Sequence, residues 1–363
     1  MKRKKRVIVG MSGGVDSSVT AALLKKRGYD VIGITMQLLQ KDSEKLSACC
    51  NLSSINDAKR VAHALKIPHY TINCRSNFQQ KVIDYFINDY LLGYTPNPCV
   101  ECNRYIKFDE LYSKMKDLDA DYVATGHYCK ITSNPNKTRF FLKKAKDHSK
   151  DQSYFLYMMQ SSQLKSILFP LGNYLKSEIR KMAQDLKFVN ANKQDSQEIC
   201  FVTKGSYRQF IEDNVSANQL RAGHITDING KILGQHDGIH RFTIGQRRGI
   251  PIQSNVPYYV IKINAKTNTV IVGQKGDLHQ SSVKLHTFTL VNHDESIIGK
   301  TFNIKSRYQM VPFKATVLDY QDNQVILKSH TPQQFVTPGQ SGVLYQNDRV
   351  VGGGIIEFNE ATN

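Results

Sequence analysis

The stretch from Ser12 to Ser17, which reads SGGVDS, has the residue types and the setting of an anion-binding site. It follows a short apolar run, Val7 to Val9, which predicts a buried parallel strand. It precedes an apolar-rich run at 19–24 that predicts a helix stopped by Gly28. Free N–H groups and the positive end of the dipole meet at a helix start. A strand, a glycine turn and a helix in this order therefore predict a site for an anion such as phosphate.

The side chains of this stretch suit the same chemistry. Two adjacent glycines carry no Cβ, so an oxyanion can come close to the backbone. The hydroxyls of Ser12, Ser17 and Ser18 can donate hydrogen bonds, and Asp16 could help to hold a magnesium ion. The common phosphate loop has a lysine after its glycines, and no lysine follows them here. The spaced glycines of dinucleotide folds are also absent, and the alternative is an ordinary glycine turn in an α/β domain.

Cysteine is the second residue type with chemical potential. The seven cysteines are an odd number in a chain without a secretion signal, which favours catalysis, redox chemistry or metal binding over structural disulfides. Cys99 and Cys102 form a C-x-x-C pair, but they lack the second pair of a zinc motif and a thioredoxin-like context. Cys200 is interpreted either as a buried, inert thiol or as a partly exposed thiol with a lowered pKa. Cys49 and Cys50 fall in a polar stretch that is predicted to be a mobile loop.

The hydrophobic pattern of the first half of the chain alternates between two periods. Apolar runs at 30–36, 68–73 and 121–128 predict further strands, and helical spacing at 54–65 and 78–92 predicts helices. Strands that alternate with helices predict an α/β domain with a parallel sheet. In such a sheet, nucleotides bind over the carboxyl ends of the strands.

Several candidate residues stand at the ends of these predicted elements. Met36 ends a strand and could lie against an adenine, or it could be a core methionine. Gly126 and His127 end a later strand and should face the same pocket, although His127 could equally be structural. Further along, an apolar helix is predicted over 154–159, and Ser177 is predicted to cap the helix that follows it.

Helical periodicity largely disappears from Arg221 onward. Short β-rich runs are separated there by glycine and Asn/Asp turns, which predicts two small β-barrels. We therefore expect an α/β domain over 1–206, a central β-rich domain over 207–280 and a C-terminal β-barrel over 281–363.

The composition of the 363-residue chain bears on its partners and its location. Lysines and arginines number 49 against 31 aspartates and glutamates, which gives a net charge of +18. Such an excess predicts a polyanionic partner, with a lysine-rich proteome bias as the alternative. No apolar run approaches the roughly 20 residues that span a bilayer. The basic start leads straight into a strand without an apolar signal region, so a cytoplasmic location and no membrane contact are expected.

Taken together, the motifs resemble those of one family. The string SGGVDS resembles the pyrophosphate loop (PP-loop) of ATP pyrophosphatases, which cleave ATP between its α and β phosphates. Together with six further strings, it makes the chain resemble the bacterial tRNA-specific 2-thiouridylases almost end to end. These strings are TPNPCVECNRYIKF (95–108), ATGHY (124–128), KDQSYFLY (150–157), SQEICFV (196–202), GQHDGIHRFTIGQRRG (234–249) and TPGQSGVLY (337–345).

The resemblance implies a three-part fold and a reaction. The N-terminal α/β domain would bind ATP, and the C-terminal β-barrel would grip tRNA. ATP would adenylate O2 of the wobble uridine with release of pyrophosphate. A persulfide on Cys200, charged by a sulfur-relay donor protein, would then deliver sulfur to C2 while AMP leaves, and the family's nucleophile falls on Cys102.

The resemblance also implies which residues bind the substrates. The ATP residues would be Gly10, Met11, Ser12, Gly13, Gly14, Val15, Asp16, Ser17, Met36 and Gly126, with Asp16 as a possible ligand of magnesium. The tRNA residues would be Asn97, Pro98, Cys99, His127, Lys150, Asp151, Gln152, Arg307, Tyr308 and Gln340.

One position departs from the family pattern and keeps alternatives open. Many relatives carry an aspartate, proposed as a general acid/base, where this chain has Cys99. Other relatives share the cysteine, so the base role has no obvious owner. One alternative is a non-catalytic tRNA-binding or iron–sulfur protein in which Cys99, Cys102 and Cys200 ligate a cluster. Another is a different adenylating ligase, which the paired thiols and the long β-rich tail argue against.

Overall fold

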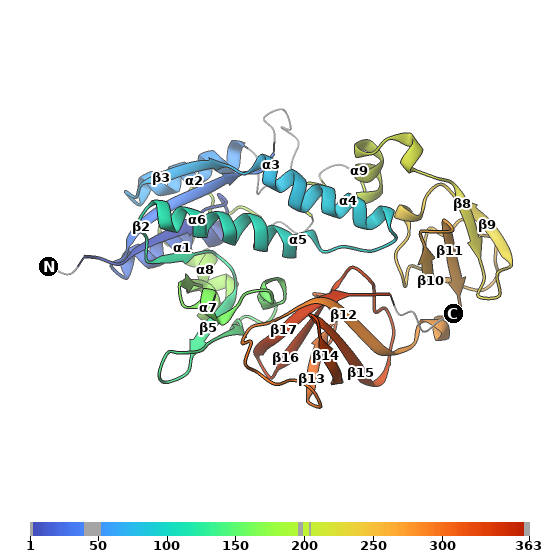
Figure 1. Cartoon of the computed structure of the whole chain (residues 1–363). Helices are drawn as coiled ribbons and strands as arrows, with labels where there is room; N and C mark the ends of the chain where they lie inside the picture. The colour runs from blue at the N-terminus through green and yellow to red at the C-terminus, as the bar shows by residue number, and fades with distance from the viewer. Residues whose placement is uncertain (1–2, 40–51, 195–198, 203–204, 359–363) are drawn as a thin grey trace.

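A five-stranded parallel sheet forms the centre of the N-terminal domain (Figure 1). The computed structural model describes residues 3–39, 52–194, 199–202 and 205–358. The strand order is β3-β2-β1-β4-β7, and every neighbouring pair is parallel, as the sequence predicts. The strands are β1 (Arg6–Gly10), β2 (Asp30–Gln37), β3 (His69–Asn73), β4 (Tyr122–Ala124) and β7 (Ile167–Leu168).

Helices cover both faces of this sheet, because successive residues of a strand point to opposite sides. Val7 and Val9 pack with apolar residues of α1, α2 and α8, whereas Ile8 packs with Leu111 of α6 on the other face. These helices are α1 (Val15–Lys26), α2 (Leu52–Ala64), α6 (Asp109–Asp117) and α8 (Lys176–Asp185). With both faces covered, the carboxyl ends of the strands are left for a ligand.

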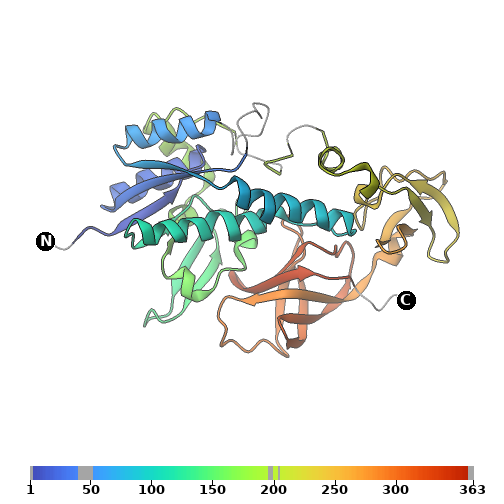
Figure 2. The same cartoon turned by 45° about the horizontal axis from the view of Figure 1, so that its top comes forward.

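Two long helical segments lead from the sheet toward the other domains. The first consists of α3 (Arg75–Phe78), η1 (Gln79–Ile83) and α4 (Asp84–Leu91). The second begins with α5 (Pro98–Glu101) and continues through η2 (Cys102–Phe108) into α6. A proline suits the start of α5, because the N–H that it lacks has no partner in a first helical turn. Figure 1 shows α4 running from the sheet toward the central domain, and Figure 2 shows the same arrangement after rotation.

The central domain is a four-stranded sheet with the order β10-β11-β8-β9, next to α9 (Tyr207–Asn214). Its strands are β8 (Gly223–Thr226), β9 (Ile232–His236), β10 (Tyr259–Asn264) and β11 (Thr269–Gly273). The central domain is mostly β, as predicted, but within the described ranges no pairing joins β9 to β10, so strand pairing does not close this sheet. The segment between these strands packs Ile239, Phe242 and Ile244 into the core of the domain.

The C-terminal domain is a closed barrel of six antiparallel strands, as predicted. The strand order is β12-β15-β14-β13-β16-β17, and β12 pairs with β17 to close it. The strands are β12 (Gln280–Leu290), β13 (Thr301–Lys305), β14 (Phe313–Gln321), β15 (Gln324–Gln333), β16 (Ser341–Gln346) and β17 (Arg349–Ile356). The N-terminal domain adds the hairpin of β5 (Cys129–Ser133) and β6 (Phe140–Lys144), which meets the barrel where Lys143 pairs with Arg349.

Three predicted details differ in the structure. Residues 154–159 are predicted as an apolar helix, but only the short helix η3 (Ser153–Leu156) forms there, and all of them except Phe155 are buried. The helix after Ser177 begins earlier, at Lys176, and the Glu178 side chain accepts a hydrogen bond from the Leu175 N–H, so Ser177 is not the cap. The strand predicted over 121–128 ends at Ala124. The other short elements are α7 (Ser161–Leu164), η4 (Pro170–Asn173), η5 (Ala217–Gln219), η6 (Ile239–Arg241) and η7 (Lys275–Leu278).

Two further predictions concern the loop before α2 and membranes. Cys49 and Cys50 lie outside the described residues. Among the helices that the structure describes, none is long and apolar enough to cross a membrane.

Gly339 is placed to hold the barrel against the segment that precedes α5. Its φ is +88°, and an added Cβ would lie 2.7 Å from the Thr95 backbone nitrogen. At Gly299 the φ is +76°, but an added Cβ would meet nothing within 4 Å. The two glycines therefore share a backbone conformation that disfavours L side chains and differ in what surrounds them.

We expect Gly339→Ala to lower the thermal midpoint more than Gly299→Ala does. Both variants strain the backbone, but only Gly339→Ala also forces Thr95 away, which should cost about 1–3 kcal/mol more. The difference should appear as several degrees in thermal unfolding monitored by circular dichroism. Equal midpoints for the two variants would show that this junction adds nothing to stability.

Candidate functional site

The SGGVDS loop joins the end of β1 to the start of α1. Gly13 has a φ of +72°, and an added Cβ would overlap the Ser54 carbonyl oxygen, so only glycine fits there. The Ser12 N–H donates to Ser17 Oγ at 3.2 Å, and that hydroxyl donates to the Gly14 carbonyl at 3.2 Å. Gly14 is the N-cap residue of α1. The loop is thus a tight turn that ends at a helix N-terminus, as the sequence predicts.

Gly126 and Met36 stand at the carboxyl ends of β4 and β2, the two strands that flank β1. Gly126 follows β4, and an added Cβ would come within 2.8 Å of the Ser17 backbone nitrogen. Met36 is near the end of β2, is only partly buried and packs against Ile8 and other core residues. The structure therefore brings Gly126 to the loop, while both roles predicted for Met36 stay open.

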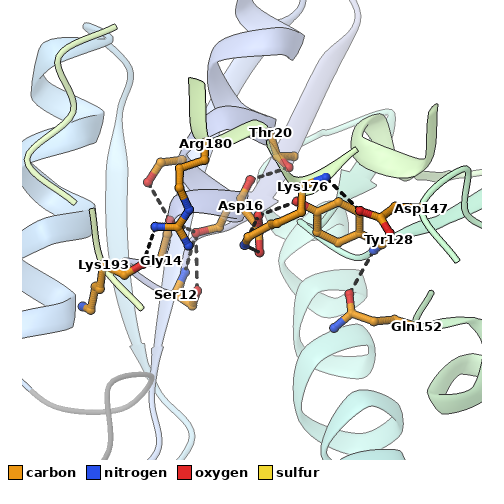
Figure 3. Close-up of polar contacts among 12 residues, drawn as sticks. Ser12, Gly14, Asp16, Thr20, Tyr128, Asp147, Gln152, Lys176, Arg180 and Lys193 are labelled. Carbon is orange, nitrogen blue, oxygen red and sulfur yellow. Dashed lines mark hydrogen bonds and ion pairs between the residues drawn. The ribbon is translucent and has the colours of Figure 1, made fainter. Parts of the chain in front are cut away.

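Asp16 is held by a cation from a distant part of the chain. Lys176 Nζ lies 2.8 Å from both carboxylate oxygens of Asp16, although the two residues are 160 positions apart. The Tyr128 hydroxyl donates to Asp16 Oδ1 at 2.8 Å. Figure 3 shows Lys176 reaching Asp16 from the start of α8. The carboxylate of the loop is thus occupied by protein groups in this structure.

The residues after α8 hold the loop from the other side. The Asn190 side chain donates to the Gly13 carbonyl at 3.0 Å and to Ser18 Oγ at 2.9 Å. Lys193 forms an ion pair with Asp57 at 2.9 Å. Sequence reasoning missed these residues and Lys176. One feature of the sequence could have indicated them. The glycine loop has no lysine of its own, so a site that binds phosphates there needs a cation from another part of the chain.

The two cysteines predicted to act together lie in one hydrophobic cluster. Cys102 begins η2 and is 8% exposed, and its cluster includes Phe201. Cys200 is partly buried and packs against the same cluster. Cys99 is exposed, three residues before Cys102 and therefore on the same side of the helix. The tertiary structure thus brings the C-x-x-C segment and Cys200 to one region.

The same residues do not form a metal centre in this arrangement. Across the described ranges, no three His, Cys, Asp or Glu side chains are placed to hold one metal ion. An iron–sulfur cluster on Cys99, Cys102 and Cys200 is therefore not shown, and it stays the alternative to the thiol chemistry. A magnesium ion needs fewer protein ligands, since it commonly takes one or two carboxylates together with substrate phosphates. Asp16 at the phosphate-type loop fits such a role.

The segment before α5 is bound by the barrel. The Thr95 N–H donates to the Pro338 carbonyl at 2.9 Å, and the Gln340 side chain donates to the Thr95 carbonyl at 2.8 Å. Asn97 shares a hydrogen bond with the Tyr154 hydroxyl. These contacts place Asn97, Pro98 and Cys99 beside the barrel, where the tRNA is predicted to lie.

Two of the predicted tRNA residues on the barrel are partly buried near this junction. Arg307 donates to the Ile244 carbonyl at 3.3 Å and to the Thr337 hydroxyl, and burial lowers its pKa. The Tyr308 ring packs on Phe155 with centroids 4.6 Å apart. Among the described residues, the buried Nε atom of Arg307 has no hydrogen-bond partner.

Three other predicted tRNA residues serve internal contacts. Asp151 is 5% exposed and accepts hydrogen bonds from the Ala145 N–H at 3.0 Å and the Ser153 hydroxyl at 2.8 Å. Gln152 Oε1 accepts from the Tyr128 N–H at 2.9 Å. His127 is buried and shares a hydrogen bond with Thr125 at 2.7 Å, and burial holds its pKa well below the usual value.

These contacts support the structural interpretation of His127, and they give Asp151 and Gln152 a positioning role. Lys150, beside them, is partly buried. The direct contacts of these residues with RNA stay predictions.

Models of known families cover nearly the whole chain. The tRNA methyl transferase HUP domain matches residues 5–204, its PRC-barrel domain matches 208–274, and the aminomethyltransferase β-barrel domain matches 281–356. The tRNA-specific 2-thiouridylase of Thermoanaerobacter pseudethanolicus is 46% identical over 361 residues, which cover 98% of this chain and 99% of that protein. The chain belongs to the tRNA-specific 2-thiouridylase family. Another member, from Acetivibrio thermocellus, is 44% identical over 98% of this chain and 99% of its own length.

Two solved structures are similar to part of the chain. A 4-thiouridine synthetase in complex with RNA and ATP is 16% identical and covers 58% of this chain and 50% of its own, with a TM-score of 0.35. NMN synthetase from Francisella tularensis is 17% identical and covers 54% and 67%, with a TM-score of 0.33. These scores are too low to support an inference about function.

A partly buried acidic pair, Glu101 and Asp89, includes the neighbour of Cys102. Burial raises the pKa of Glu101; Arg104 opposes the shift, and Asp89 adds to it. Burial also raises the pKa of Asp89 to about 6, against a hydrogen bond from Tyr85. An aspartate in an unfolded chain has a pKa of about 3.9, so the folded state binds more protons than the unfolded state between these values. Stability from Asp89 is therefore complete below pH ~4 and is lost as the pH rises through about 6.

We expect Asp89→Asn to raise the thermal midpoint at pH 8 and to give no gain at pH 4. The amide removes the cost of a buried charge, and a net gain of ~1 kcal/mol corresponds to a few degrees in the midpoint. Scanning calorimetry at both pH values measures the effect. Asp185→Asn, at an exposed position of α8, is the control, and its change in thermal midpoint should be the same at pH 4 and pH 8. A gain that is the same at pH 4 and pH 8 would contradict the assignment.

Proposed function

We propose that this protein catalyses the ATP-dependent 2-thiolation of the wobble uridine of tRNA. The observation that carries this proposal is the 46% identity to a tRNA-specific 2-thiouridylase over 98% of the chain. Two structural features support it: the SGGVDS turn stands at the carboxyl end of β1, and Cys102 and Cys200 share one cluster. Because the reaction consumes ATP and tRNA, we expect it to take place in the cytoplasm.

The first half of the proposed reaction takes place at the loop between β1 and α1. The backbone N–H groups between Ser12 and Ser17 would bind the ATP phosphates, with Gly126 and Met36 beside the nucleotide. Asp16 would hold magnesium, which neutralises phosphate charge when bound. Uracil O2 attacks the α-phosphorus, and the bond to the pyrophosphate oxygen breaks as pyrophosphate leaves. The poor leaving group on C2 thereby becomes AMP.

The second half uses the two cysteines. A donor protein charges Cys200 with a sulfane sulfur, and the terminal sulfur of this persulfide attacks C2 while AMP leaves. The Cys102 thiolate then attacks Cys200 Sγ, which forms a Cys102–Cys200 disulfide and releases the sulfur on C2 as 2-thiouridine. An external thiol reductant restores both thiols. Both cysteines pack in the same hydrophobic cluster, which supports their acting on one another.

The tRNA is proposed to bind along the barrel and the segment before α5. The net charge of +18 favours binding of a polyanion. The contact between Thr95 and Gln340 ties the segment before Cys102 to the barrel. The target uridine must leave the anticodon stack to reach this region.

We expect Cys102→Ser and Cys200→Ser each to abolish 2-thiouridine formation while tRNA binding is kept. A hydroxyl can neither carry sulfane sulfur nor form the resolving disulfide. Nucleoside mass spectrometry measures the product, with a persulfide donor supplied. The control is Cys74→Ala, in the same cluster, where burial raises the thiol pKa to about 12. If Cys200→Ser kept a tenth of the activity, the relay through Cys200 would be wrong.

Cys99 tests whether a general base is needed at its position. Since ATP supplies the activation of C2, we expect Cys99→Asp to stay within roughly tenfold of the parent rate, about 1.4 kcal/mol in barrier, and Cys99→Ala to remain active but slower. The assays are run anaerobically with iron measured in parallel. Loss of iron and activity together in Cys99→Ala would favour a cluster, and loss of activity alone, rescued by Asp, would favour an essential base.

A further inference from the structure

The glycine loop lacks a lysine of its own, and the fold brings one to it. Lys176 is the first residue of α8, and its Nζ lies 2.8 Å from both oxygens of Asp16. Lys176 is only 12% exposed and Asp16 31% exposed, so this ion pair is partly withdrawn from water. Figure 3 shows the pair beside the loop, with the Tyr128 ring next to the lysine.

We propose that Lys176 is a catalytic residue that supplies the phosphate-binding ammonium missing from the loop, and that Asp16 holds it until magnesium–ATP binds. The inference rests on the proposed use of ATP. When the nucleotide enters, Lys176 exchanges Asp16 for an oxygen of the β-phosphate, and Asp16 becomes available to the metal. As the bond between the α-phosphorus and the pyrophosphate oxygen breaks, the ammonium stabilises the negative charge that collects on pyrophosphate.

The surroundings of Lys176 fix its backbone and leave its head group as the part that moves. Its own N–H donates to Asp147 Oδ2 at 2.9 Å, and the preceding Leu175 N–H donates to Glu178 at 2.5 Å. One turn further along α8, Arg180 donates to the carbonyl oxygens of Ala191 and Lys193, at 3.4 and 3.2 Å. The start of α8 is therefore anchored, and a lysine has enough rotatable bonds to change partners without moving the helix.

Asp16 is likewise prepared to exchange its partner. The Tyr128 hydroxyl also binds its carboxylate, and Tyr128 is itself held through its N–H by Gln152. The Asp16 carbonyl accepts a hydrogen bond from Thr20 at 2.8 Å within α1. A partly buried carboxylate needs a positive partner, and magnesium can replace the ammonium only when phosphate oxygens complete its coordination. The exchange therefore couples metal binding at Asp16 to the presence of ATP.

An ion pair with a purely structural role would not couple metal binding at Asp16 to the presence of ATP. If Lys176 only stabilised the fold, its loss would lower the thermal midpoint without changing the metal affinity of Asp16. If it masks Asp16, its loss should expose a carboxylate to metal in the absence of nucleotide. The two roles therefore differ in a measurement that requires no turnover.

The experiment compares Lys176→Gln with Lys181→Gln on the same helix, where the side chain is exposed. Paramagnetic resonance measures Mn²⁺ binding to the nucleotide-free protein, equilibrium dialysis measures magnesium–ATP binding, and a coupled assay measures pyrophosphate release. We expect Lys176→Gln to bind Mn²⁺ about tenfold more tightly than wild type, to bind magnesium–ATP more weakly and to release pyrophosphate at least 100-fold more slowly. Lys181→Gln should match wild type in all three.

Rescue and folding complete the test. Lys176→Arg keeps the positive charge and should restore pyrophosphate release to within tenfold of wild type while keeping Mn²⁺ binding weak. If Lys176→Gln does not fold, Lys176→Met, which keeps an unbranched apolar side chain without the charge, takes its place. Unchanged Mn²⁺ binding together with pyrophosphate release within threefold of wild type would overturn the inference. Wild-type protein that binds no ATP would instead overturn the proposed function, and Mn²⁺ binding would still report on the ion pair.

Discussion

The contacts between Thr95 and residues 338–340 are the constraint on which the arrangement of the domains depends. A backbone N–H and a backbone carbonyl of one residue are both satisfied by the barrel, at 2.9 and 2.8 Å. Buried backbone groups are costly to leave without partners, so this segment can take few other positions. The helix that begins at Pro98 starts directly after it. The place of Cys99 and Cys102 relative to the barrel therefore follows from how one short loop of the barrel is bound.

Electrostatics divides the molecule into two kinds of site. The chain is strongly basic as a whole, which favours long-range attraction of a polyanion. At the loop, by contrast, single charges are paired: Asp16 with Lys176 and Asp57 with Lys193. The acidic pair Asp89 and Glu101, which includes the neighbour of Cys102, is partly buried, and this burial raises both pKa values. Diffuse positive charge suits binding of RNA, whereas paired local charges suit a site in which one small ligand must replace a protein partner.

Close backbone approach is the second recurring device. Gly13 meets the Ser54 carbonyl, Gly126 meets the start of α1, and Gly339 meets Thr95, and in each place a Cβ would collide with backbone atoms. Backbone cannot rotate away as a side chain can, so these three glycines fix distances between elements that lie far apart in the sequence. Two of them belong to the nucleotide loop region and one to the junction with the barrel.

The sequence alone predicted the parallel sheet, the glycine turn, the closed barrel and the family, because each depends on local pattern or on unbroken strings of residues. The helix over 154–159 was wrong, and strand pairing among the described residues does not close the central sheet. In both places side chains are buried by distant parts of the chain, which no local period records. The same reason explains the site. The sequence placed Asp16 at the turn and identified Cys102 and Cys200 as candidate catalytic thiols. Only the tertiary structure showed that Lys176 pairs with Asp16 and that the two cysteines pack in one cluster. Packing between elements decides which residues come into contact across 160 positions, and the spacing of residues along the chain does not reveal such contacts.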